Sequence, residues 1–378
     1  MRTLFQQIIN EAIMEGGNAI PSAQEVRGDI AGRIANDIIA ALTKTFGCNA
    51  SPVGSTGKKG PDAYSGDIDI LLDLPWEYDK DQKQAIGKTQ EIAEWVEQNF
   101  PGCEIAVQPG FKQISFGYPY KEDGDEEKIA QVDLMFTANF EWRKFSMSSP
   151  SPKDSGFKGM VRTVLIKQVA KAVPLPNDKD YPEEFYGDDE FGGKYTGKKK
   201  AFYRHMWDDE RGLVIAYFSN LGKRGMLSDF SADQERKIGV ASALKDGIRM
   251  VFGPEVTMED LYSPETIVAF LFSGRYPYDT PEKLQRIHNG MTYFFLGQKY
   301  SKKEKETMDQ LANQINDGTM SLEEINAIDP ILGAFEKLWR EYAGESQGQP
   351  QGEPAYSAAL NENRRYSLKM RGLIKRMK

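Results

Sequence analysis

The chain has 378 residues, of which 40% are hydrophobic and 28% are charged. This length and composition predict two or three globular domains with a substantial core. No apolar run has the length that a bilayer requires, and the N-terminus lacks a signal-peptide pattern, so we expect no membrane segment. The net charge of −8 argues against nucleic-acid binding over the whole surface, because such binding requires cations that neutralise phosphates. Cys48 and Cys103 provide neither a disulfide framework nor a cysteine-based zinc site, and they indicate a reducing cytoplasm.

The first part of the chain is predicted to alternate between helices and strands. Apolar residues at four-residue spacing indicate an amphipathic helix over residues 23–46, and Gly47 follows it as a helix-ending residue. The apolar run Asp67–Leu74 is typical of a buried strand that ends before Pro75. The other predicted elements are a strand before Gly54, helices over residues 80–99 and 155–172, strands over 104–107 and 113–118, and a strand around Asp133.

The later part of the chain is predicted to be mostly helical. Residues 175–198 are rich in Pro, Gly and Asp and are expected to form a loop, and the next residues alternate around Asp208–Arg211 as in a β-hairpin. Predicted helices then cover residues 232–251, 257–271, 281–296, 302–316 and 321–342.

These elements predict an α+β fold class. We expect a domain over residues 1–175, with a small mixed β-sheet flanked by helices, and a hairpin plus helical domain over residues 176–343. Residues 344–356 are rich in Gln, Gly and Pro, as in a flexible linker, and residues 357–378 form a basic C-terminal segment.

Acidic residues in two of the predicted strands are the first indication of a functional site. Asp67 and Asp69 are two positions apart, so their side chains point to the same face of the strand, and Asp133 interrupts a second apolar run. Carboxylates in core strands are costly, and neighbouring ones repel each other. A divalent cation such as Mg²⁺ removes both problems, so we expect these aspartates to be metal ligands rather than salt-bridge or capping residues. Asp73 shares their face but lies at the strand end, where we expect it to face solvent or to support the site.

The turn at Gly54 and Ser55 is the second indication of a functional site, because such a turn can bind phosphate. Glycine lets a backbone approach a phosphate closely, and a helix N-terminus favours its negative charge, although a plain turn with a helix cap explains the same residues. Lys58 and Lys59 follow, either extending a phosphate site or lying in solvent. The run is not a Walker A loop, because Lys58 is followed by Lys59 rather than by Ser or Thr.

Together these motifs resemble those of the DNA polymerase β-like nucleotidyltransferase superfamily. Its signature is a Gly-Ser or Gly-Gly turn opening a helix, then Asp-x-Asp on the next strand, then a third Asp on a later strand. Here the parts are Pro52-Val53-Gly54-Ser55-Thr56-Gly57-Lys58, Ser65-Gly66-Asp67-Ile68-Asp69 and Val132-Asp133-Leu134. The resemblance covers roughly residues 20–175 and looks closest to the nucleotidyltransferases of tailed bacteriophages, which would place the protein in the host cytoplasm. The run Asp154–Arg162 also looks like that group.

The resemblance implies an enzyme that transfers an NMP from an NTP to a hydroxyl with release of pyrophosphate. Asp67, Asp69 and Asp133 would be the catalytic residues and would hold two Mg²⁺ ions, for which Mn²⁺ could substitute. The implied nucleotide-binding residues are Gly54, Ser55, Ser65, Ser155 and Lys158. For Ser155 and Lys158, an ordinary helix cap with an exposed lysine remains the alternative.

The acceptor stays open between an RNA end, a protein hydroxyl and a small molecule. Two other functions also stay open: a cyclic-dinucleotide or oligonucleotide synthase on the same fold, and a non-catalytic virion or scaffold protein with a relic site. His205 and His288 lack ligand spacing, and we expect them to be structural. The segment Arg364–Lys378 is strongly basic and has apolar residues among its cations, so it could contact nucleic acid or pack as a helix on the acidic body of the chain.

Overall fold

In the computed structural model, the described residues are 19–56, 60–122, 126–148, 155–157, 159–174, 185–188, 194–196, 201–219, 237–301 and 304–344. The expected linker after Gly344, the basic segment Arg364–Lys378 and the three lysines Lys58, Lys59 and Lys158 lie outside them. The chain divides into two compact units. Unit 1 consists of residues 1–160 with 208–212, and unit 2 consists of residues 161–207 with 213–378.

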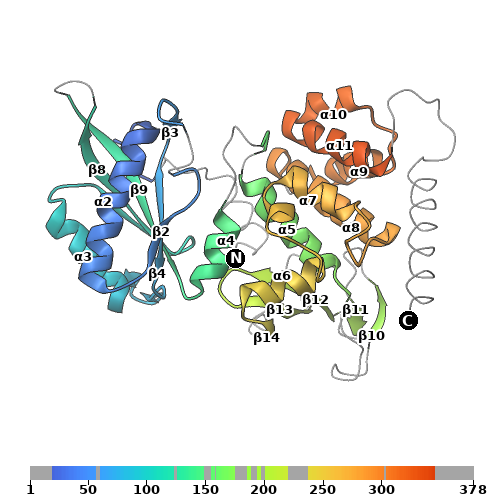
Figure 1. Ribbon diagram of the computed structural model, residues 1–378, viewed down its shortest axis with the longest axis horizontal. Coiled ribbons are helices and arrows are strands. Elements are labelled where there is room, and N and C mark those ends of the chain that lie inside the picture. Colours follow the sequence, from blue (N-terminus) through green and yellow to red (C-terminus); the bar gives the residue numbers. More distant parts are fainter. Residues whose placement is uncertain are drawn as a thin grey trace. The chain divides into compact units, whose positions relative to one another are not determined.

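Unit 1 is built on a five-stranded mixed sheet (Figure 1). In spatial order its strands are β2 (Ala50–Pro52), β4 (Ile68–Asp73), β9 (Glu127–Thr137), β8 (Gln113–Lys121) and β7 (Ile105–Gln108). The central pair, β4 and β9, is parallel, and the other neighbours are antiparallel. The mixed sheet agrees with the predicted α+β class, and the strands predicted around Asp67, Asp133 and residues 104–118 are confirmed.

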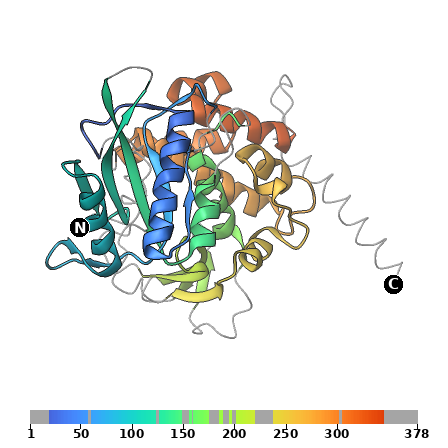
Figure 2. The ribbon, with the colours of Figure 1, turned by 60° about the vertical axis from the view of Figure 1, so that its left-hand side comes forward.

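One face of this sheet carries the core of unit 1. Ile68 pairs with Val132 and Ile70 with Leu134, and all four side chains are fully buried. Two helices, α2 (Gly28–Phe46) and α3 (Gly87–Asn99), pack their apolar stripes on this face, and Figure 2 shows α2 lying along the sheet. Since strand side chains alternate, the intervening residues of β4 and β9, including Asp69 and Asp133, point to the opposite face.

The boundaries of the helices in unit 1 differ in places from the prediction. Gly47 ends α2 in the left-handed conformation, as predicted. The helix predicted over residues 80–99 begins only at Gly87, because the preceding residues form a small hairpin with a tight turn in which Lys83 has φ of 54°. Helix α4 (Phe140–Met147) was not predicted, and it buries Trp142 and Phe145. The short strand pairs of unit 1 are β1 (Val26–Arg27) with β3 (Tyr64–Ser65), and β5 (Tyr78–Asp79) with β6 (Gln84–Ala85).

Unit 2 combines a five-stranded sheet with helices. The strands, in spatial order, are β10 (Phe185–Asp188), β11 (Lys194–Thr196), β12 (Ala201–Asp208), β13 (Gly212–Ser219) and β14 (Lys237–Ala241). The helices are α5 (Gly159–Ala172), α6 (Leu244–Phe252), the 3₁₀ helix η4 (Glu259–Leu261), α7 (Pro264–Leu271), α8 (Pro281–Lys299), α9 (Lys305–Asn316), α10 (Leu322–Ile328) and α11 (Pro330–Ala343). None of the helices in the described part of the chain is long and apolar enough to span a bilayer.

Four predictions for unit 2 were wrong in detail. The predicted helix over residues 257–271 is the 3₁₀ helix η4 followed by α7, which Ser263 caps. Residues 175–198 include strands β10 and β11 rather than only loop. The predicted helix over residues 232–251 contains strand β14, whose Ile238 pairs with Ile215, so pairing with the hairpin outweighs local helix propensity. The predicted helix over residues 321–342 is two helices, because Asp329 caps a new helix that starts at Pro330.

A buried ionic network joins α8 and α11. Glu336 is 2% exposed and accepts hydrogen bonds from His288 Nε2 at 2.6 Å and Arg340 Nε at 2.7 Å. The His288 ring stacks on Trp339 with 5.0 Å between the ring centroids, in agreement with its predicted structural role. Burial raises the pKa of Glu336, but attraction to His288 and the hydrogen bonds outweigh burial and hold this pKa below the ordinary 4.5.

We therefore expect Glu336→Gln to lower the free energy of unfolding by about 3 kcal/mol at pH 7, because it leaves the buried His288 and the half-buried Arg340 without their charged partner. A carboxyl whose pKa is lowered by folding stabilises the protein above its unfolded pKa, and this contribution is lost as pH falls through the folded value. The difference between the parent and variant should therefore shrink below pH 4.5. Urea denaturation across pH measures it, with the exposed Glu341→Gln of the same helix as the control. Equal stability of the parent and Glu336→Gln at pH 7 would contradict this account.

Candidate metal centre

Three aspartates meet on the face of the unit 1 sheet opposite α2 and α3. Asp69 in β4 and Asp133 in β9 are directly paired in the parallel register, and Asp67 immediately precedes β4. Each offers a carboxylate oxygen, and these oxygens all lie within 4.8 Å of one another. Asp133 is buried, whereas Asp67 and Asp69 are half-buried. The structure thus brings together all three aspartates that the sequence predicted as metal ligands.

Gly54 shapes the site by being small. Its φ is +60°, and a Cβ at this position would lie 2.0 Å from Asp69 Oδ2. The Gly54 N–H donates to the Met147 carbonyl at the end of α4 at 3.3 Å, so this N–H is used within the chain. The residues described after Gly54 form a turn rather than the start of a helix, so the expectation of a helix N-terminus at Ser55 is wrong. The absence of a side chain at Gly54 therefore leaves the space that the Asp69 carboxylate occupies.

Hydroxyl groups surround the same turn. The Oγ atoms of Ser55 and Ser65 are hydrogen-bonded at 2.9 Å, which joins two of the predicted nucleotide-binding residues. Thr56 is buried, and its Oγ1 accepts a hydrogen bond from the Asp69 N–H at 2.9 Å. The turn is further held by the Val53 N–H, which donates to the Asp69 carbonyl at 3.1 Å. These bonds fix the backbone of Asp69 against the Gly54 turn.

Side-chain amide and hydroxyl groups surround the Asp133 carboxylate. The Gln131 amide donates from Nε2 to Oδ1 at 3.0 Å and to Oδ2 at 3.1 Å. Ser115 is the cross-strand neighbour of Asp133 in β8, and Gln113 lies two residues before it. Burial raises the pKa of Asp133, and the hydrogen bonds from Ser115, Gln131 and Gln113 oppose this rise only in part. A cation beside the carboxylate would favour its charged form further.

The remaining predicted residues take other positions. Ser155 is buried, and its Oγ accepts a hydrogen bond from the Phe157 N–H at 3.1 Å, which is a local turn before α5. Lys158 lies outside the described residues. The Asp73 carboxylate accepts a hydrogen bond from the Asn49 side chain at 3.0 Å and is not part of the three-carboxylate cluster. Asp73 is thus hydrogen-bonded to the residue that precedes β2 and not to the cluster.

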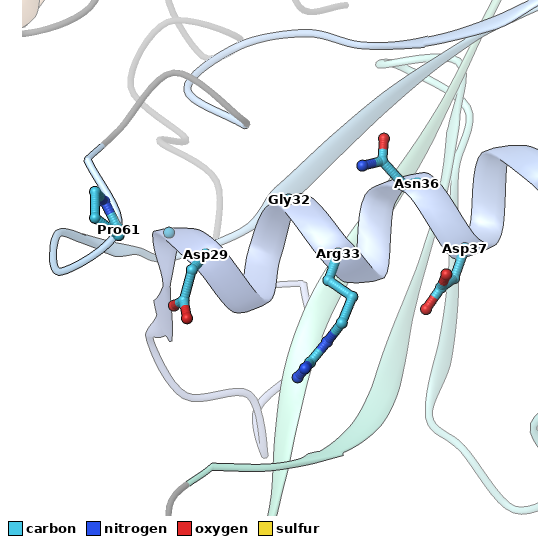
Figure 3. Close-up of a pocket in the computed structure, with 7 residues that line it drawn as sticks. Asp29, Gly32, Arg33, Asn36, Asp37 and Pro61 are labelled. Carbon is cyan, nitrogen blue, oxygen red and sulfur yellow. The ribbon is translucent and has the colours of Figure 1, made fainter.

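A separate hollow lies along the N-terminal half of α2 (Figure 3). It has a volume of about 640 Å³, and Gly28 and Gly32, one turn apart, leave the space that side chains would fill. Asp29, Arg33 and Asp37 extend from the same side of the helix in Figure 3. None of the three aspartates of the cluster lines this hollow.

Comparison with known proteins gives only distant similarity. The chain matches no protein-family model and no curated protein sequence. Among solved structures, it is similar to polymerase beta of Leishmania infantum in a ternary P/T complex, with 12% identity and a TM-score of 0.34 over 61% of this chain and 74% of that chain. The ternary gap complex of that protein gives 12% identity and a TM-score of 0.34 over 64% of this chain and 77% of that chain. This overlap is too loose to assign an activity.

Sequence reasoning missed several residues that support the cluster. Gln131 could have been noticed, because it lies two positions before Asp133 and so shares its face of the strand. Ser115 and Thr56 could not, because their contacts depend on the strand register and on the path of the turn. The role of α4 in holding Gly54 also depends on the tertiary structure.

We expect Gly54→Ala to weaken metal binding by about tenfold or more, because its Cβ would displace the Asp69 carboxylate. The backbone strain of a non-glycine residue at this φ adds about 1–2 kcal/mol of destabilisation. Calorimetric titration with Mn²⁺ measures the affinity. The control is Gly32→Ala in α2, where an added Cβ meets nothing within 4 Å. Mn²⁺ affinity of Gly54→Ala equal to that of the parent would show that Gly54 does not shape the site.

Proposed function

We propose that this chain is a metal-dependent nucleotidyltransferase that moves an NMP from an NTP to a hydroxyl acceptor. The observation that carries the proposal is the cluster of Asp67, Asp69 and Asp133, with carboxylate oxygens within 4.8 Å of one another beside a glycine turn. The order of these motifs along the chain, which resembles the polymerase β-like superfamily, supports the same function. Fold likeness alone would leave the activity open.

The donor set of the cluster fits a hard divalent cation. All three groups are carboxylates, the ligand type that Mg²⁺ and Mn²⁺ prefer, and no histidine or cysteine belongs to the cluster. Negative groups this close repel one another, so the arrangement favours a bound cation. Asp67 and Asp69 would hold two ions and Asp133 one of them. When bound, such ions neutralise the triphosphate and activate the attacking hydroxyl.

The protein groups would then position the reactants. Asp67 and Asp69 are half-buried and so accessible to a triphosphate. Ser65 is buried, and when its hydroxyl supplies the hydrogen of the bond to Ser55, the half-buried Ser55 hydroxyl can donate to a phosphate oxygen. Asp133 Oδ would take the proton of the acceptor hydroxyl. The acceptor oxygen forms a bond to the α-phosphorus, the bond from that phosphorus to the bridging oxygen breaks, and pyrophosphate leaves. Positioning and charge stabilisation supply most of the rate enhancement.

We expect Asp67→Ala and Asp69→Ala each to reduce transfer by at least about 100-fold. The test is transfer of α-³²P label from each of the four NTPs, with and without added cellular RNA and protein as acceptors. Asp73→Asn is the matched control, because Asp73 is on the same strand face but outside the cluster. Removing one of the repelling carboxylates should leave the melting temperature without metal unchanged or higher.

The labelled product identifies the acceptor, since RNA, protein, small-molecule and cyclic dinucleotide products separate from one another. Parent-level transfer by Asp69→Ala would contradict the site assignment. If the parent labels no product from any NTP, the proposed activity is wrong, and a non-catalytic role for the cluster becomes the better explanation.

A further inference from the structure

Gln131 is a buried amide that links Asp133 to a distant part of the chain. It is 1% exposed, and its Oε1 accepts hydrogen bonds from the backbone N–H groups of Ala19 at 3.0 Å and Ile20 at 3.1 Å. Because two donors point at this atom, it must be the amide oxygen, so the nitrogen necessarily faces Asp133. The orientation of the amide is therefore fixed by the backbone and not by the carboxylate that it contacts.

The contact with Asp133 is symmetric. Gln131 Nε2 lies 3.0 Å from one carboxylate oxygen and 3.1 Å from the other. Such a contact restrains the rotation of the carboxylate about its Cβ–Cγ bond, because turning it would lengthen one of the two hydrogen bonds. Each oxygen keeps a second lone pair that can bind another group.

A second donor approaches Asp133 from the neighbouring strand. Ser115 is fully buried, and its Oγ accepts a hydrogen bond from Gln113 Nε2 at 3.1 Å. The same hydroxyl is hydrogen-bonded to Asp133, its cross-strand neighbour, and it donates there because an ionised carboxylate only accepts. The carboxylate is thus held by donors from its own strand and from β8.

We propose that Gln131 is the positioning residue of the metal centre, holding Asp133 in the orientation that binds the cation. This inference rests on the proposed function and adds a residue that does not touch the metal or the substrate. Supporting hydrogen bonds that orient metal ligands commonly contribute 10- to 100-fold in metal affinity. Gln131 fits this role because the backbone of residues 19–20 fixes one end of its amide.

The test compares Mn²⁺ binding to the full-length variants, measured from the electron paramagnetic resonance signal of free Mn²⁺ without nucleotide. Gln131→Met keeps the length of the side chain but removes both ends of the amide, and we expect about 10- to 100-fold weaker binding. Ser115→Ala removes the second donor, together with the hydrogen bond that Ser115 accepts from Gln113, and leaves the Ala19 and Ile20 contacts in place, so we expect a smaller loss. Thr137→Val is the control: Thr137 is a buried polar residue of the same strand whose Oγ1 accepts from the Asn139 N–H.

Thr137→Val should bind Mn²⁺ like the parent, although it also loses a buried hydrogen bond. Affinity of Gln131→Met equal to that of Thr137→Val would overturn the proposal. If Gln131→Met does not fold, Gln131→Asn decides, because it keeps the amide but is too short to contact both Asp133 and the backbone of residues 19–20. Unchanged affinity in that variant overturns the proposal. A failure of the proposed function looks different, since the parent and Asp69→Ala would then bind Mn²⁺ equally.

Discussion

The parallel pairing of β4 with β9 is the constraint on which the site depends. Its register sets Asp69 beside Asp133 on one face and Ile70 beside Leu134 on the other. A slip of one residue would turn the aspartates of one strand into the core and its apolar residues out of it. The burial of the apolar face under α2 and α3 therefore fixes the position of the carboxylates, so the core of unit 1 and its candidate metal centre are specified by the same register.

The position so specified is electrostatically unfavourable without a partner. Burial raises the pKa of Asp133, and Asp67 and Asp69 lie close enough to repel it. Two neighbouring side chains, Gln131 and Ser115, donate to Asp133, and Gly54 leaves room for the Asp69 carboxylate. Gln131, Ser115 and Gly54 carry no charge, so they position the carboxylates without neutralising them, and a bound divalent cation would add that neutralisation.

Much of unit 1 could be predicted from the sequence because its signals are local. The four-residue spacing of α2 and the aspartates in apolar runs required only neighbouring residues. Other features depend on contacts between distant segments. Helix α4 has a short apolar pattern, strand β14 forms by pairing with β13, and the Ala19 and Ile20 contacts of Gln131 join residues more than a hundred positions apart. The role of Gly54 was predicted incompletely, because only the structure places Asp69 against it.

The most direct test of this account is anomalous diffraction from crystals of the protein grown with Mn²⁺ and a non-hydrolysable NTP analogue. The account predicts anomalous difference peaks for Mn²⁺ ions that are coordinated by carboxylate oxygens of Asp67, Asp69 and Asp133, with the triphosphate bound to the same ions. Ordered Mn²⁺ elsewhere on the protein, with none bonded to these three aspartates, would contradict it.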